Sequence, residues 1–151
     1  MDIKGTINEV SNIIKDINAW LKKQKGDSRA LITELKDNLT YLEMVNKHGV
    51  DIDEILKDLK IDVYNRLQNE GFSFNTIKNK KIPKLKNIEG SDLASWKGKT
   101  TDDLVVSIYD KIRNLKASYP KLKNRPNIRW NVRVTNISKR IILLLHHVRS
   151  S

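Results

Sequence analysis

The sequence contains no cysteine among its 151 residues. This absence excludes disulfide bonds, thiol nucleophiles and zinc sites built from thiolates. A chain that needs no disulfide fits a reducing compartment, so we expect a cytoplasmic protein. Long apolar runs are missing as well. The longest covers residues 141–145, far short of the ~20 residues that span a bilayer, so membrane insertion is not expected.

Acidic residues are missing from the last part of the chain. Residues 111–151 carry eleven Lys or Arg and no Asp or Glu, whereas the first 110 positions carry eighteen of each sign. The whole formal charge of +11 therefore lies in the final quarter of the sequence. Such one-sided charge indicates an anionic partner, either nucleic acid (RNA or DNA) or an acidic protein.

Five segments show helical periodicity, and none shows the sustained alternation of a strand. They cover approximately residues 3–21, 28–47, 51–70, 101–119 and 128–149. The last is apolar on nearly all sides in its second half, which is typical of a central helix. We therefore predict an all-α single domain over residues 1–151. It should be an irregular bundle of about five helices around the first, second and last.

The few glycines and prolines help to place the helix ends. The triplet at residues 26–28 is expected to end the first helix and to cap the second, and Gly71 to close the third. Thr100 should cap the fourth helix, with Asp102 and Asp103 in its first turn, and Pro120 should end it. Residues 72–100 form a long loop with seven Lys and two acids, in which residues 91–96 could make one turn.

The basic residues supply the candidate binding site. Arg125, Arg129 and Arg133 lie four apart, and Arg140 follows seven residues later, so in a helix they would form one cationic ridge. Each phosphate that such a ridge neutralises releases counterions, which gives salt-sensitive affinity. The expected nucleic-acid-binding residues are Lys121, Lys123, Arg125, Arg129, Arg133, Lys139 and Arg140, with a second strip at Lys78, Lys80, Lys81 and Lys84.

Two polar residues fall on the second helix where apolar ones are expected. Asn38 lies in the seam of leucines, and Glu34 lies one turn before it. A buried polar group needs a partner, because an unpaired amide costs about 1–3 kcal/mol. The pair is therefore expected to be buried and to fix the helix register. Alternatively, it faces Arg133 or Arg140 and braces the basic ridge.

Arg140 and His147 lie seven residues apart on the last helix. After seven helical residues the azimuth returns to within about 20°, so both would share a face, ~10 Å apart. The pair resembles the arginine–histidine signature of HEPN-type ribonucleases, all-α bundles that cleave RNA without metal and often place the pair at a dimer interface. The resemblance implies that His147 is the general acid or base and that Arg140 stabilises charge at the phosphate. Position 141 is Ile where that family often has a polar residue.

These observations predict a small basic helical module that binds nucleic acid or an acidic protein without catalysis. The alternatives are a metal-independent ribonuclease that uses Arg140 and His147, or a structural subunit that assembles through its first and last helices. Three histidines without ligand spacing give no support for a metal site, and no cofactor is expected.

Overall fold

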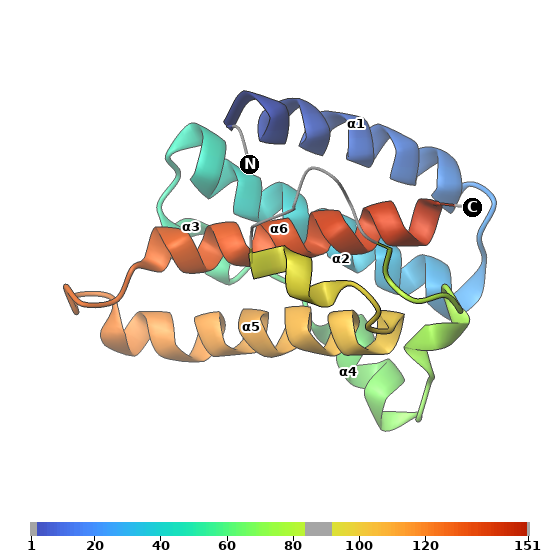
Figure 1. Cartoon of the computed structure of the whole chain (residues 1–151). Coiled ribbons are helices and arrows are strands. Elements are labelled where there is room, and N and C mark those ends of the chain that lie inside the picture. Colours follow the sequence, from blue (N-terminus) through green and yellow to red (C-terminus); the bar gives the residue numbers. More distant parts are fainter. Residues whose placement is uncertain (1–2, 84–91, 151) are drawn as a thin grey trace.

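The computed structural model describes residues 3–83 and 92–150, and every regular element in these residues is a helix (Figure 1). The order along the chain is α1 (Ile3–Leu21), α2 (Gly26–His48), α3 (Ile52–Leu56), α4 (Asp62–Asn69), the 3₁₀ turns η1 (Phe74–Thr76) and η3 (Asp92–Trp96), α5 (Thr101–Leu122) and α6 (Trp130–Arg149). The predicted all-α bundle is thus confirmed.

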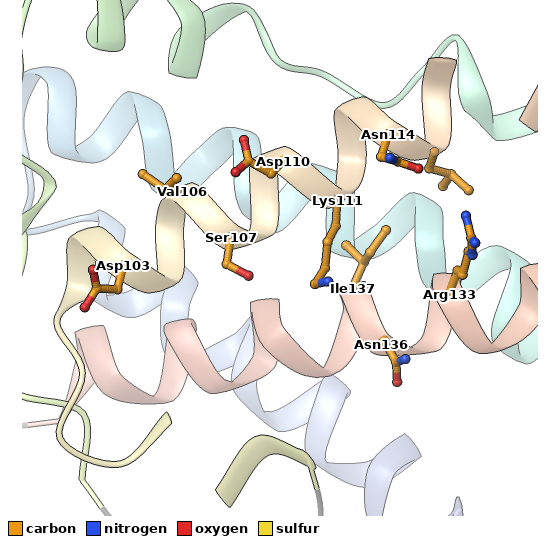
Figure 2. Close-up of a pocket in the computed structure, with 10 residues that line it drawn as sticks. Asp103, Val106, Ser107, Asp110, Lys111, Asn114, Arg133, Asn136 and Ile137 are labelled. Carbon is orange, nitrogen blue, oxygen red and sulfur yellow. The ribbon is translucent and has the colours of Figure 1, made fainter. Parts of the chain in front are cut away.

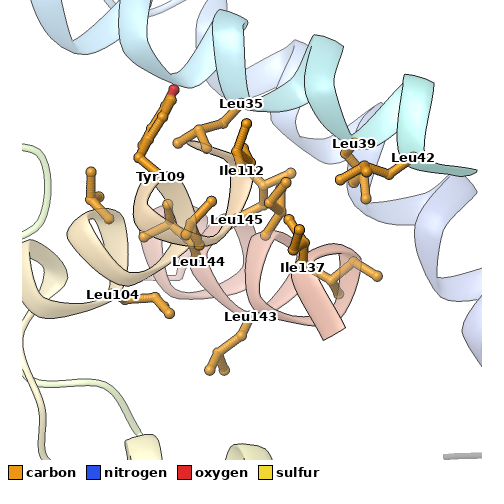
Figure 3. Packing of buried hydrophobic residues seen from close by; sticks show 14 of the residues in the cluster. Leu35, Leu39, Leu42, Leu104, Tyr109, Ile112, Ile137, Leu143, Leu144 and Leu145 are labelled. Atoms are coloured by element: carbon orange, nitrogen blue, oxygen red, sulfur yellow. The ribbon is translucent and has the colours of Figure 1, made fainter. Parts of the chain in front are cut away.

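α6 is the centre of the bundle because its apolar residues surround the helix. It packs against α2, α5 and α1, and Figure 1 shows it running between α1 and α5. The five consecutive residues 141–145 are all buried, so every side of the helix is covered by a neighbour over this stretch. Figure 3 shows Leu143, Leu144 and Leu145 pointing in different directions from α6, with α2 residues such as Leu35 and Leu39 nearby.

The apolar seams that suggested assembly are buried within one chain. On α1, Val10, Ile13, Ile17 and Leu21 join the same hydrophobic core as the α6 side chains. A second copy is therefore not needed to cover these four α1 residues or the buried residues of α6.

The third predicted helix is wrong as a single element. It is two short helices, α3 and α4, separated by a turn that buries Leu59. Side chains from other helices bind the backbone of this turn and prevent a continuous helix. Asn38 of α2 bonds the amide and carbonyl of Lys60 at 2.7 and 2.8 Å, which removes both groups from a helical ladder. Lys116 of α5 donates to the carbonyls of Leu56 and Leu59 at 2.6 and 2.8 Å.

The predicted helix ends are right in part. Thr100 caps α5 in a capping box with Asp103, as expected. Gly71 follows α4 with φ at 74°, a backbone conformation that favours glycine. Pro120 does not end α5, which continues to Leu122, because a proline in the last turn removes only one ladder bond. α2 begins at Gly26, with Lys25 rather than Ser28 at its N-cap.

The predicted long loop is more ordered than its sequence suggests. η1 places Phe74 in the core, stacked on Tyr64 at 5.5 Å, and η3 lies where one turn was expected. Ile82 pairs with the far end of the loop, since its amide donates to Lys99 and its carbonyl accepts from Gly98, both at 2.9 Å. Lys84 lies outside the described residues.

Candidate polyanion-binding surface

The connection between α5 and α6 lies at one end of the bundle (Figure 1). Five exposed basic residues lie in this connection and in the helix turns beside it. Aromatic packing holds this end together, because the rings of Tyr119 and Trp130 meet edge to face at 5.0 Å. Turn hydrogen bonds from Arg125 to Leu122 and from Ile128 to Arg125 shape the backbone between the helices. We call the exposed residues here the tip cluster; they are Lys121, Lys123, Arg125, Arg129 and Arg133.

The tip cluster is not the single helical ridge that the spacing predicts. α6 begins at Trp130, so Arg125 and Arg129 precede the helix and Arg129 is its N-cap residue. Arg133 lies on the first turn, with its guanidinium 5.1 Å from the centre of the Trp130 ring. Lys139 and Arg140 are half-buried further along α6, where Arg140 donates to the carbonyl of Asn136 at 3.0 Å.

Several other cations of the acid-free segment hold the fold together. Arg113 donates to Asn65 and lies over the Tyr64 ring, and Lys116 binds the carbonyls at the end of α3. Arg149 forms an ion pair with Asp16 at 3.4 Å. Lys123 of the tip cluster lies 3.6 Å from Asp53, but both side chains are exposed, so this pair contributes little. The cations left for a partner are concentrated at the tip.

A second basic group, the loop cluster, forms around the paired ends of the 72–100 segment. It contains Lys78, Lys80 and Lys81, as expected, and the Ile82 backbone pairing adds Lys97 and Lys99. Lys99 lies over the Trp96 ring at 4.6 Å. Burial lowers the pKa of Lys78, and the charge of Lys80 lowers it further.

The two basic clusters lie at opposite ends of α5. The first residue of the helix, Thr101, donates its hydroxyl to the Lys78 carbonyl at 2.6 Å, whereas Lys121 is in the last turn. A helix of 22 residues is about 33 Å long, so the clusters cannot contact the same phosphate. They are two separate basic sites.

A groove of about 690 Å³ runs between α5 and α6 (Figure 2). Lys111 and Arg133 line one part of it, and Asp103 and Asp110 line another. The acids interrupt the positive surface between the two clusters. Asp103 lies in the first turn of α5, beside the loop cluster, so its charge offsets part of the positive charge there and favours the tip cluster as the main contact site.

Glu34 and Asn38 are buried, and their partners come from the 60–64 turn rather than from Arg133 or Arg140. Glu34 accepts hydrogen bonds from the amides of Val63 and Tyr64 at 2.8 and 3.3 Å. It thus caps α4 from another helix, because Ile61 at the N-cap position has no side-chain acceptor. The Tyr109 hydroxyl donates to the same carboxylate at 2.8 Å. Burial and this carboxylate both raise the pKa of Tyr109.

His147 lies inside the fold, with only 2% of its surface exposed. Its Nε2 is 2.8 Å from the Thr101 hydroxyl, and a backbone hydrogen bond joins the ring to Lys80. The histidine therefore fastens the end of α6 to the start of α5 and to the loop cluster. In this arrangement the 2′-hydroxyl of an RNA cannot reach the ring. The ribonuclease chemistry expected at Arg140 and His147 would require the contacts of His147 with Thr101 and Lys80 to break.

We expect a His147→Gln variant to lose part of the pH dependence of folding. Burial lowers the pKa of His147 below its ordinary value of 6.5, and the charge of Lys78 lowers it further. As the pH falls, the unfolded chain therefore takes up the proton before the folded chain does. The stability that neutral His147 contributes is complete above its ordinary pKa of 6.5 and is lost as the pH falls below that value. Urea unfolding at about pH 7.5 and about pH 5.5 measures the loss, which should be smaller in the variant.

A matched control is His48→Gln, which changes an exposed histidine at the end of α2. This variant should keep the pH dependence of the unaltered protein. An equal reduction in both variants would show that burial of His147 is not the cause.

Comparison with protein families, with curated proteins and with solved structures finds no match to this chain. The HEPN resemblance therefore stays a prediction from two residues. Within residues 3–83 and 92–150, no helix is long and apolar enough to cross a membrane. The same residues contain no group of three or more His, Asp or Glu that could hold a metal ion.

Proposed function

We propose that the protein binds nucleic acid through the tip cluster, without catalysis. The observation that supports this most is the exposure of Lys121, Arg125, Arg129 and Arg133 at one end of the bundle, with no carboxylate in an ion pair to any of them among the described residues. A phosphate backbone carries condensed counterions, and exposed cations that neutralise its phosphates release these counterions on binding. The affinity that results is strong at low salt and independent of base sequence.

The start of α6 adds to this positive field. The amino end of a helix carries a partial positive charge, and α6 has neither an acidic residue in its first turn nor a side-chain cap. Phosphate groups bind well at such helix ends. An acidic protein would be attracted by the same charges, and binding of polyglutamate compared with binding of RNA and DNA distinguishes the two kinds of partner.

We expect the triple variant Arg125→Ala, Arg129→Ala, Arg133→Ala to bind nucleic acid much more weakly. Each phosphate contact contributes about one unit to the slope of log affinity against log salt, so the slope should fall by about three units. Fluorescence anisotropy with a labelled oligonucleotide, titrated between about 50 and 200 mM salt, measures both the affinity and the slope.

The matched control is Lys15→Ala, Lys22→Ala, Lys23→Ala, which removes the same charge from exposed positions on and just after α1. It should bind almost as the unaltered protein does. Equal losses in the two variants would mean that net charge alone attracts the nucleic acid. If the protein retains polyglutamate but neither RNA nor DNA at low salt, the partner is an acidic protein and the proposal is wrong.

A further inference from the structure

A pocket of about 590 Å³ opens beside the tip cluster, at the amino end of α6. Its walls come from four parts of the chain: the end of α2, the start of α3, the end of α5 and the first turn of α6. The lining combines polar groups with aliphatic and aromatic side chains, among them Val50, Tyr119, Ile128 and Val132. Val132 is 48% exposed, so its side chain is accessible to a ligand in the pocket. Concave pockets of this size that offer both apolar and polar wall groups commonly hold small ligands or single groups of a larger one.

The pocket wall contains a buried hydrogen-bond donor without an acceptor. Trp130 is 9% exposed, and its indole Nε1 has no partner within hydrogen-bond distance in the described part of the chain. Buried indole N–H groups usually have an acceptor, because leaving one unpaired costs about 1–3 kcal/mol. An acceptor on a ligand would satisfy this donor once wall side chains moved aside.

The mouth of the pocket favours a negative charge. Arg129 lines it as the N-cap residue of α6, together with the uncapped first turn, Asn131 and Val132. Asp51 also lines the pocket, from the start of α3, so its interior is not uniformly positive. The site thus combines apolar wall side chains, polar groups, a buried donor on a lining residue and the positive charge of Arg129.

We propose that this pocket binds one unpaired nucleobase of a single strand whose phosphates contact the tip cluster. This inference rests on the function proposed above. A base has two apolar faces for the aliphatic walls and carbonyl or ring-nitrogen acceptors for the Trp130 donor. Its phosphate would lie at Arg129 and the amino end of α6. Bases of a duplex are stacked and paired, so only an unstacked base can enter.

Affinity for a single strand and for a duplex of the same length and sequence, measured at one salt concentration, tests the proposal. The unaltered protein should prefer the single strand by about tenfold. Trp130→Phe keeps an aromatic side chain but replaces the indole by a smaller ring without the donor, and should reduce this preference about three- to tenfold. Val132→Phe, at a half-exposed position, should narrow the pocket and reduce the preference to a similar extent. In both variants the salt slope should be unchanged.

The matched control is Trp96→Phe, since Trp96 is also 9% exposed but belongs to η3, outside the pocket. It should keep the preference for the single strand. Equal binding of single strand and duplex by the unaltered protein would overturn the nucleobase pocket and leave the tip cluster as a phosphate site. Unchanged preference in Trp130→Phe and Val132→Phe would overturn it as well. Failure to bind either nucleic acid at low salt would overturn the proposed function itself.

Discussion

Replacing Glu34 by alanine is expected to lower the free energy of unfolding by about 3–5 kcal/mol. The buried carboxylate accepts three hydrogen bonds, from the amides of Val63 and Tyr64 and from the Tyr109 hydroxyl. Its removal leaves three donors without an acceptor in the interior and takes away the cap of α4. Urea unfolding followed by circular dichroism measures the loss.

Two further variants test this explanation. Glu54→Ala removes an exposed carboxylate from α3 and should change stability by no more than about 0.5 kcal/mol. Glu34→Gln keeps one acceptor oxygen. The decrease in its free energy of unfolding should therefore lie between the decreases of the two alanine variants. If Glu34→Ala were as mild as Glu54→Ala, then water or another side chain would be able to satisfy the α4 amides.

Leu144→Ala is expected to destabilise the protein by about 3–4 kcal/mol. Leu144 is fully buried on the central helix, where α1, α2 and α5 all pack (Figure 3). Because three neighbouring helices would have to move together to fill the space, a cavity should remain after truncation. The measurement is the midpoint and slope of urea unfolding.

Val132→Ala serves as the comparison on the same helix. Its side chain is half exposed, so truncation should cost less than about 0.5 kcal/mol. A similar cost at the two positions would contradict the central place of α6 in the core.

The sequence was sufficient to predict the long helices, because their apolar spacing is a local property. The break between α3 and α4 could not be found this way. The residues that impose it, Asn38 and Lys116, come from distant helices, and the local pattern of residues 51–70 continues through the turn. The α5 cap at Thr100 was found because both of its partners lie within four residues of each other.

For the candidate site, the sequence revealed the charge asymmetry. It did not reveal which basic side chains bind other groups of the fold. Arg149 and Lys116 bind groups more than fifty residues away, so no local signal separates them from Arg125 and Arg129. Lys97 and Lys99 join the loop cluster only through the Ile82 pairing. The lack of an acidic residue at the start of α6 was visible in the sequence. No Asp or Glu follows Asp110, so no carboxylate from the adjoining chain could cap that helix.

The turn between α3 and α4 also bears on the order of events as the chain folds. Helices of five and eight residues are too short to persist alone in water. The side chains that secure this turn belong to α2 and α5, so they are in position only after those two helices have met. Residues 50–71 should consequently become ordered late, after α2 and α5 have packed together. On unfolding, this segment should lose its structure before those two helices separate.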